Sequence, residues 1–384
     1  MRVLVYGSGQ LAQMMYLAGC PLGIDVQAVD VNNDTIVHPV NKTLLESNLE
    51  LAIESADALT VEFEHVPERL LEQAAKTSKL MPSIEAILVG ADRVREKRLL
   101  DRLSVPNCLY QIVSDIEQLD ECVAKLGDKL IIKASRDGYD GYGQWRMTDI
   151  AQLDELKKAL SALDLNAVPL VVEKMLQFDR ELSLIGVRGK KGEIKIYPLT
   201  ENLHHQGQLH VSVAPALDIS PALQSEAENI FTTLAEGMEY IGVLAVEMFQ
   251  CGNTLLVNEL APRVHNSGHW TLSGSDTSQF ENHLRAVAGL PLGDTVAKQP
   301  SAMVNIIGCS SFSRDLLSIP GCHLHWYGKS VRDKRKMGHI NVTADSYISL
   351  GEKLEQLAQY LPLEYFPKLL KEAARLKQSY TTPC

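Results

Sequence analysis

The stretch Val243 to Pro262, VLAVEMFQCGNTLLVNELAP, predicts a β-hairpin that turns about Asn253. In that register residues whose numbers sum to 506 lie opposite each other, so Glu247 faces Glu259. Two opposed carboxylates repel each other, and each of these lies in an apolar context where a lone charge is costly to bury. The simplest alternative is a pair of solvated surface carboxylates. A divalent cation shared by both side chains would remove the repulsion and the burial cost.

The chemistry of the two side chains indicates which cation this would be. Ligand sets made only of oxygen favour a hard ion, and Mg²⁺ is typically held by one or two carboxylates together with substrate phosphates. We therefore predict that Glu247 and Glu259 bind Mg²⁺, with nucleotide phosphate completing its coordination.

The next part of the chain, NELAPRVHNSGHW, combines a carboxylate, an arginine and two histidines. His265 and His269 are four residues apart, which on a helix would place both on one face with a spacing typical of zinc ligands. The other interpretation is an anion site with Arg263 and His265 as donors. Pro262 and Gly268 argue against an ordinary helix that would align the two histidines, but the choice between the two interpretations depends on the rest of the chain.

A phosphate-binding region is predicted upstream of the hairpin. Lys133 ends the apolar strand KLIIKAS, where a lysine can reach inward to phosphate oxygens. The sequence RDGYDGYGQW follows, and Gly138, Gly141 and Gly143 permit close backbone approach to an anion, as a mobile lid over phosphates requires. A plain hairpin turn is the alternative for the glycine loop alone.

The N-terminal part alternates β and α signals. RVLVYGSGQLAQMMYLAG reads as a strand, a glycine turn and a helix, GIDVQAVD as a second strand, and ADALTVEFE as a third strand before a helix that opens at Pro67. This alternation predicts a doubly wound parallel sheet. The pattern changes near Ala91 to the charged helix ADRVREKRLLDRL, where we place the first domain boundary.

The first glycine turn also matches the dinucleotide fingerprint. Gly7, Gly9 and Ala12 fit G-x-G-x-x-A, and Asp30 lies about twenty residues further on. A nicotinamide-dependent oxidoreductase is therefore an alternative, although it leaves the carboxylate hairpin unexplained. Small residues at a first strand-to-helix turn are common in any doubly wound domain.

Composition sets broad limits on function. The chain has 384 residues, which predicts two or three domains, and its net charge of −11 disfavours a broad nucleic-acid surface or binding to an anionic membrane. Its seven cysteines form no C-x-x-C pair, which suits free thiols in a reducing compartment. No apolar run approaches the roughly 18 residues of a membrane span, and we expect a cytoplasmic protein.

Several longer motifs together resemble the ATP-grasp superfamily and, within it, the 5-(carboxyamino)imidazole ribonucleotide synthetase family. They occur in the order GSGQLAQM, EFEHVP, ADRVREKRL, GYDGYGQW, YPLTENLHH, NELAPRVHNSGHWT, HLHWYGK and RKMGHIN, over almost the whole chain. The resemblance implies an α/β protein with an N-terminal doubly wound domain at 1–92, an ATP-grasp domain at 93–294 with a lid at about 106–180, and a C-terminal domain at 295–384.

The resemblance implies a carbon–nitrogen ligase of purine biosynthesis that requires ATP and Mg²⁺. Bicarbonate would attack the γ-phosphate to form carboxyphosphate, which would carboxylate the amine of aminoimidazole ribonucleotide. The family is also expected to form homodimers and to pass its product to a separate mutase. By the same resemblance, ATP would be bound by Arg93, Lys133, the loop Gly138, Tyr139, Asp140, Gly141, Tyr142, Gly143 and Gln144, the adenine hinge Glu173, Lys174, Met175 and Leu176, and by Glu181, His204, Asn258 and Glu259.

The remaining expected roles concern bicarbonate and the ribonucleotide. The resemblance implies catalytic roles for Arg263, His265, Asn266, Tyr139 and Asp140. The residues expected to bind the ribonucleotide are Gln10, Leu11, Glu62, Lys329, Arg335 and Lys336. The chain departs from the family at Tyr142, where a basic residue is usual, and Arg136 is a candidate replacement.

Two further alternatives remain beside the oxidoreductase. One is an ATP-grasp ligase acting on another phosphorylated amine, such as the formate-using glycinamide ribonucleotide enzyme. The other is a nucleotide-binding module without catalysis. The presence of Lys133, Glu247 and Glu259 is evidence against it.

Overall fold

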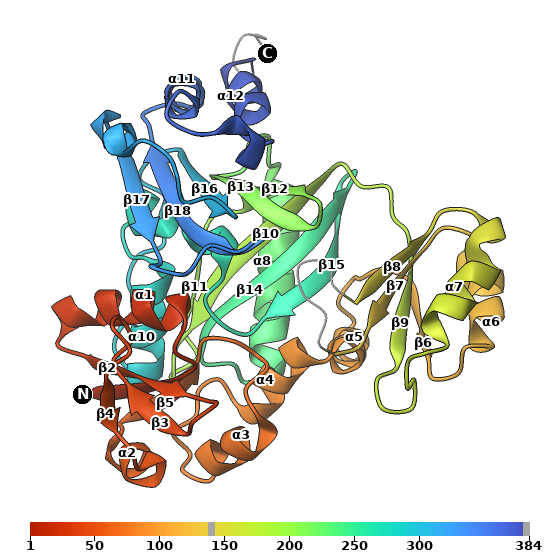
Figure 1. The fold of residues 1–384 in the computed structure, drawn as a ribbon, viewed down its shortest axis with the longest axis horizontal. Helices are drawn as coiled ribbons and strands as arrows, with labels where there is room; N and C mark the ends of the chain where they lie inside the picture. The colour runs from red at the N-terminus through yellow and green to blue at the C-terminus, as the bar shows by residue number, and fades with distance from the viewer. Residues whose placement is uncertain (137–142, 379–384) are drawn as a thin grey trace.

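The computed structural model describes residues 1–136 and 143–378, whose strands form three sheets (Figure 1). A sheet near the N-terminus and a small sheet of residues 110–174 stand on either side of a large central sheet. Within the described residues, no helix is both long and apolar enough to cross a membrane. The six cysteines there are free, and four of them are buried, while Cys20 is exposed and Cys251 is half-buried.

The N-terminal sheet has the strand order β4-β3-β2-β1-β5. Its strands are β1 Arg2–Tyr6, β2 Asp25–Asp30, β3 Thr35–Val37, β4 Leu44–Glu46 and β5 Ala58–Val61. Strands β1, β2 and β5 are parallel, as predicted, whereas β3 and β4 extend the sheet in antiparallel fashion. The link from β2 to β3 is too short for the crossover that a parallel pair requires, so β3 must return alongside β2.

Both faces of this sheet are covered, which explains the unbroken apolar run in β1. On one face Val3 and Val5 pack with α1 Gln10–Gly19 and α10 Gln279–Ala288. On the other face Leu4 and Tyr6 pack with α2 Leu49–Ser55 and α3 Glu68–Ala75. The helices of this region are α1 Gln10–Gly19, α2 Leu49–Ser55, α3 Glu68–Ala75 and α4 Ile84–Ala91, with a 3₁₀ turn at Cys20–Leu22. Helix α3 begins directly after Pro67, as expected.

The central sheet has the order β15-β14-β10-β12-β13-β16-β18-β17, and β11 pairs with β10. Its strands are β10 Arg180–Arg188, β11 Ile194–Ile196, β12 Thr200–His205, β13 Gln208–Ala214, β14 Gly242–Cys251, β15 Thr254–Ala261, β16 Ser301–Ile307, β17 Cys322–Trp326 and β18 Lys336–Thr343. Strand β16 pairs with β13, so the sheet continues across the predicted boundary between 294 and 295. That boundary divides the chain but not the sheet.

Helices cover the central sheet and link it to its neighbours. The α-helices around it are α5 Arg93–Arg102, α8 Pro221–Gly237, α9 Thr271–Gly274, α10 Gln279–Ala288, α11 Tyr347–Ala358 and α12 Leu369–Gln378. Helix α8 packs in the core behind β10, β14 and β15, whereas α11 and α12 cover the C-terminal strands (Figure 1). Short 3₁₀ turns occur at Asn266–Gly268, Arg314–Ser318 and Leu363–Tyr365.

The small sheet has its own hydrophobic core and lies within the region predicted to be a lid. Its order is β6-β9-β7-β8, formed by β6 Tyr110–Val113, β7 Leu130–Ala134, β8 Gln144–Met147 and β9 Leu170–Lys174. Helices α6 Gln118–Leu126 and α7 Leu153–Leu160 cover its outer face, and a 3₁₀ turn occurs at Ile150–Gln152. Its inner face is turned toward β14 and β15 of the central sheet (Figure 1).

Candidate functional site

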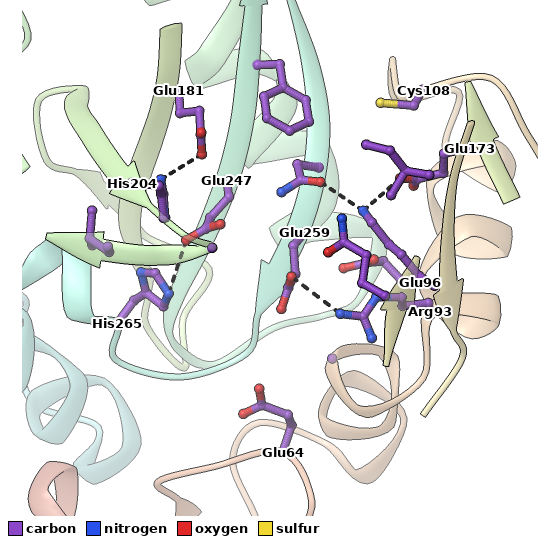
Figure 2. Close-up of a pocket in the computed structure, with 18 of the residues that line it drawn as sticks. Glu64, Arg93, Glu96, Cys108, Glu173, Glu181, His204, Glu247, Glu259 and His265 are labelled. Carbon is purple, nitrogen blue, oxygen red and sulfur yellow. Dashed lines mark hydrogen bonds and ion pairs between the residues drawn. The ribbon is translucent and has the colours of Figure 1, made fainter. Parts of the chain in front are cut away.

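A cavity of about 940 Å³ lies between the small sheet and the central sheet. Its lining comes from all parts of the fold, including Glu64 after β5, Lys133 on β7, Glu259 on β15 and Lys336 on β18. Figure 2 shows charged side chains converging on this space from opposite walls. The structure thus brings into one cavity residues that are more than two hundred positions apart in sequence.

The hairpin wall carries the two carboxylates predicted to face each other. Glu247 on β14 is paired with Glu259 on β15, and a register shift separates this pair from the next one, Met248 with Val257. Asn258 is therefore the extra residue of a β-bulge, which is why Asn258 and Glu259 both line the cavity although they are adjacent.

The Glu247 carboxylate lies in a setting that resists ionisation. Burial and the facing charge of Glu259 raise its pKa to about 7, although the charge of His204 partly offsets them. Its polar neighbour is Nε2 of His265, at 3.3 Å. Burial and the charge of Arg263 hold the pKa of His265 well below its usual value, so the ring is neutral and does not compensate the carboxylate. The Glu259 carboxylate lies 3.9 Å from Nη2 of Arg93, which is too far for a close ion pair.

This donor set fits Mg²⁺ better than zinc. Two opposed, incompletely compensated carboxylates leave oxygen atoms available to a hard cation whose remaining ligands come from phosphate. Among residues 1–136 and 143–378 no group of three or more His, Cys, Asp or Glu side chains is arranged to hold a metal ion. His265 is the extended N-cap residue before the 3₁₀ turn, and the ring of His269 is fully buried beside Gln279, so the two histidines do not form the zinc-like pair.

The opposite wall carries an ion-paired cluster around Glu173. Its carboxylate lies 2.7 Å from Nζ of Lys97 on α5 and 2.7 Å from Nζ of Lys133 on β7. Burial disfavours the charged carboxylate, but the two lysines outweigh burial and lower the pKa of Glu173 to about 2. Lys133 also donates to Oδ1 of Asn258 at 3.3 Å, which connects this wall to the hairpin.

The predicted adenine hinge lies at the end of β9. Lys174 and Leu176 line the cavity, whereas the backbone N–H of Met175 donates to the carbonyl of Lys129 at 2.8 Å. Glu173 lies within the strand, and its side chain points at Lys97 and Lys133. Phe178 and Phe249 stack with ring centroids 4.4 Å apart, and both line this end of the cavity.

Glu181 on β10 and His204 on β12 form a pair on the wall of the central sheet, on the same side of the cavity as Glu247, with Nδ1 of His204 2.8 Å from a carboxylate oxygen (Figure 2). Burial opposes protonation of His204, but the hydrogen bond and charge of Glu181 outweigh it and raise the pKa of the ring. Glu181 therefore favours the protonated form of His204.

Most of the predicted glycine loop lies outside the described residues. This applies to Gly138, Tyr139, Asp140, Gly141 and Tyr142. Of the loop that is described, Gly143 has φ +67°, which favours glycine, and Gln144 lines the cavity at the start of β8. Arg136, the candidate replacement for a basic residue at position 142, forms a 2.8 Å ion pair with Asp92, the N-cap of α5.

The predicted anion-binding residues converge where β15 ends. Arg263, His265 and Asn266 all line the cavity. The Asn266 side chain is held by a reciprocal pair of hydrogen bonds with Asn305, at 3.1 and 2.6 Å. Arg263 is held by Glu64, with Nε to Oε2 at 2.6 Å and Nη2 to Oε1 at 3.0 Å.

The predicted ribonucleotide residues gather beside this cavity, around the first glycine turn. Nζ of Lys329 donates to Oε1 of Gln10, 319 positions away, and the Lys329 side chain lies near Glu62. Burial and the charge of Arg335 lower the pKa of Lys329 to about 8. Arg335 itself donates to Ser330, at 2.9 and 3.1 Å. Leu11 packs against the core below, and Lys336 lines the main cavity.

The same glycine turn argues against the alternative of dinucleotide binding. The Glu62 carboxylate accepts from the backbone N–H groups of Gly9 and Ala12, the latter at 2.9 Å. A Cβ atom at Gly9 would lie 2.7 Å from Oε1 of Glu62. Glycine is therefore needed here because the Glu62 side chain comes close, and not because a cofactor does. A carboxylate therefore occupies the helix N-terminus where a dinucleotide pyrophosphate would bind.

Sequence reasoning missed several residues at the site, among them the stacked Phe178 and Phe249 and three charged residues. Lys97 and Glu96 lie in a helix that reads as charged and solvated, yet they are 1% and 3% exposed. Oε1 of Glu96 accepts from the backbone N–H of Leu260 at 2.6 Å. The signal was their spacing, because residues 93, 96, 97 and 100 share one helix face that ends in an apolar leucine. The third residue, Glu64, had no comparable local signal.

Comparison with known proteins places this chain in a family. The ribonucleotide synthetase preATP-grasp domain matches residues 1–90, the ATP-grasp domain matches 98–280, and the phosphoribosylaminoimidazole carboxylase C-terminal domain matches 301–353. An N5-carboxyaminoimidazole ribonucleotide synthase of Vibrio cholerae is 50% identical over 371 residues, or 96% of this chain and 97% of the relative.

Solved structures agree with the sequence matches. The N5-carboxyaminoimidazole ribonucleotide synthetase of Thermus thermophilus has a TM-score of 0.82 at 39% identity, covering 94% of this chain and 98% of that one. The N5-carboxyaminoimidazole synthase of Aspergillus clavatus, in complex with ADP and 5-aminoimidazole ribonucleotide, has a TM-score of 0.80 at 29% identity, covering 93% and 97%.

Proposed function

This chain belongs to the N5-carboxyaminoimidazole ribonucleotide synthase family of ATP-grasp ligases, and on that premise we propose that it carboxylates 5-aminoimidazole ribonucleotide with bicarbonate and ATP. The observation that carries the proposal is the opposed pair Glu247 and Glu259, which faces the Lys97–Glu173–Lys133 cluster across the cavity. Two carboxylates on one wall and cations on the other suit a nucleotide triphosphate with its metal ion.

The reaction needs two bond exchanges at neighbouring positions. An oxygen of bicarbonate attacks the γ-phosphorus as its bond to the β-bridging oxygen breaks, which releases ADP and forms carboxyphosphate. The exocyclic amine of the ribonucleotide then attacks the carbonyl carbon, the bond from that carbon to the phosphate oxygen breaks, and phosphate leaves with the proton that nitrogen loses. Positioning and charge neutralisation supply most of the catalysis in such a sequence.

The nucleotide would span the cavity from the end of β9 to the hairpin. Adenine would lie against Lys174 to Leu176 and the phenylalanine pair, with the ribose near Glu181. Lys133 and Arg93 would contact the phosphates, and the small sheet would close over them. Glu247 and Glu259 would hold Mg²⁺, which neutralises phosphate charge when bound.

Bicarbonate would bind where Arg263, His265 and Asn266 converge. The neutral His265 and the positively charged Arg263 offer donors to an anion, and the hydrogen-bonded Asn266 is fixed in place. The ribonucleotide would lie between this point and Gln10, with its reacting amine near Glu62 and its phosphate near Lys329 and Arg335. Tyr139 and Asp140 would act from the glycine loop.

The wider setting follows from the family. We expect a homodimer in the cytoplasm that passes its product to a separate mutase. The domain limits 1–92, 93–294 and 295–384 remain predictions of the same kind.

The test is ADP release by the purified protein with ATP and Mg²⁺. Aminoimidazole ribonucleotide and bicarbonate are added separately and together, with formate replacing bicarbonate in a parallel series. We expect release that requires both substrates and gives one carboxylated product per ADP. Stimulation by formate, or none by the ribonucleotide, would contradict the proposed substrates.

A further inference from the structure

A buried ion pair joins the N-terminal domain to the predicted anion site. Glu64 lies just after β5 and Arg263 just after β15, 199 positions apart. Two nitrogens of the guanidinium contact the two carboxylate oxygens, at 2.6 and 3.0 Å. The side chains are only 12% and 18% exposed, so little solvent screens the pair.

Both members of the pair are charged at neutral pH. Burial of Glu64 disfavours its ionised form, but the charge and hydrogen bonds of Arg263 outweigh burial and lower the pKa of the carboxyl group. A buried, two-point contact between opposite charges fixes orientation more strictly than a single hydrogen bond.

The contact determines which edge of the guanidinium is available. Glu64 occupies the edge formed by Nε and Nη2 of Arg263, and Nη1 donates to the carbonyl of Val264 at 3.1 Å. A guanidinium has five N–H donors, so donors at the Nη1 and Nη2 end remain for an anion. Arg263 lines the cavity beside His265 and Glu259. Without Glu64 the long arginine side chain would sample several rotamers.

Glu64 also belongs to a loop that reaches the ribonucleotide residues. Glu62, two positions earlier, caps α1 at Gly9 and Ala12, and Phe63 and Glu64 line the main cavity. One short segment thus contacts the first glycine turn at one end and Arg263 at the other. Figure 2 shows Glu64 entering the cavity from the N-terminal domain, below Glu259.

We propose that Glu64 is a positioning residue that holds Arg263 against carboxyphosphate and so keeps ATP cleavage coupled to carboxyl transfer. The inference rests on the proposed function, because it assigns Arg263 to that intermediate. An arginine out of position would leave carboxyphosphate open to water, which converts it to bicarbonate and phosphate. ATP would then be consumed without a carboxylated product.

The test compares the ADP formed with the carboxylated product formed, using labelled bicarbonate. The wild-type protein should form about one ADP per product, whereas Glu64→Gln should raise this ratio at least about twofold and lower the product rate roughly tenfold. Asp34→Asn is the matched control, because Asp34 and Arg69 form the same two-point contact, at 2.7 and 2.8 Å, on the surface of the same domain. Its ratio should stay at one.

A purely structural role for Glu64 predicts a different result. Loss of folded protein would lower ADP and product together, so a ratio of one in folded Glu64→Gln overturns the inference. If that variant does not fold, Glu64→Asp decides, since it keeps the charge but cannot reach both nitrogens in the same geometry. A raised ratio in Glu64→Asp supports the inference, and a ratio of one overturns it. Failure of the proposed function would be distinguishable, because wild-type ADP release would then not depend on both substrates.

Discussion

The two walls of the cavity each carry a glutamate, and they place it in opposite electrostatic settings. Glu173 lies between Lys97 and Lys133, and its pKa is lowered to about 2 because the two cations outweigh its burial. Glu247 faces another carboxylate, and burial together with that charge raises its pKa to about 7. Figure 2 shows the two groups on opposite sides of one space.

The difference distinguishes a charge that the protein compensates from one that it leaves for a ligand. The Glu173 carboxylate is compensated by Lys97 and Lys133, and of these two lysines Lys133 lines the cavity. The pair at Glu247 has a conflict that a cation resolves, and local conflicts of this kind concentrate at functional sites. Removing a carboxylate should therefore have opposite effects on stability at the two walls.

The largest expected effect is the loss of turnover in Glu259→Gln. The variant removes a proposed metal ligand, so turnover should fall on the order of a thousandfold. Without nucleotide, its free energy of unfolding should be unchanged or higher, because the repulsion with Glu247 is gone. Steady-state kinetics and urea unfolding measure the two quantities. Glu281→Gln, outside the cavity, is the control, and near-normal turnover in Glu259→Gln would remove the metal assignment.

Glu173→Gln should act in the opposite direction on stability. It leaves the buried Lys97 and Lys133 without their counter-charge, which should lower the free energy of unfolding by about 3 kcal/mol. Urea unfolding of the ligand-free variant measures this loss. A stabilised Glu173→Gln would show that the two walls do not differ as described.

The pH dependence of stability sharpens the comparison. The Glu247 carboxyl group titrates near 4.5 when unfolded and at about 7 in the ligand-free fold, so the folded protein keeps a proton that the unfolded chain releases. This contribution, on the order of 3 kcal/mol, is complete below pH 4.5 and is lost as the pH rises through 7.

Urea unfolding of Glu247→Gln in the presence of a chelator isolates that contribution. The decline in stability between pH 4.5 and 7 should be smaller in the variant than in the wild type, and the part that remains comes from other buried carboxyl groups such as Glu96, whose pKa is raised to about 8. Glu173 contributes the reverse dependence, since its lowered pKa gives stability that is present above pH 4.5 and lost as the pH falls toward 2. Identical pH profiles for the wild type and Glu247→Gln would contradict the raised pKa.

The smallest effect is expected at the contact between the two walls. Asn258→Ala removes the 3.3 Å hydrogen bond to Lys133 but leaves the carboxylates in place. A single hydrogen bond of this kind is worth about 1 kcal/mol, which corresponds to roughly a fivefold rise in KM for ATP. An effect as large as that of Glu259→Gln would mean that Asn258 does more than orient the lysine.

The hairpin shows how far the sequence alone leads. The expected register sum of 506 holds for Glu247 with Glu259, but near the turn Cys251 pairs with Thr254 and the sum is 505. Near the turn the pairing is therefore shifted by one residue from the predicted register. The extra residue of the bulge, Asn258, brings the register back to a sum of 506. The opposed carboxylates were therefore predicted correctly, while the bulge that turns Asn258 into the cavity was not, because local sequence does not specify bulges.

Other features depend on contacts that sequence spacing does not encode. Strands, glycine turns and family motifs identified the three parts and half of the residues that line the cavity. The Glu64–Arg263 pair and the burial of Lys97 arise only when distant segments pack together. The predicted roles of Tyr139 and Asp140 fall outside the described residues.

The most direct test of the central claim, that Glu247 and Glu259 form the cation site, is a titration with Mn²⁺ in place of Mg²⁺. Free Mn²⁺ is followed by electron paramagnetic resonance in the presence of ADP, for the wild type, Glu247→Gln and Glu259→Gln. The account predicts Mn²⁺ binding to the wild-type complex and at least roughly tenfold weaker binding in each variant. Equal affinity in all three proteins would contradict it.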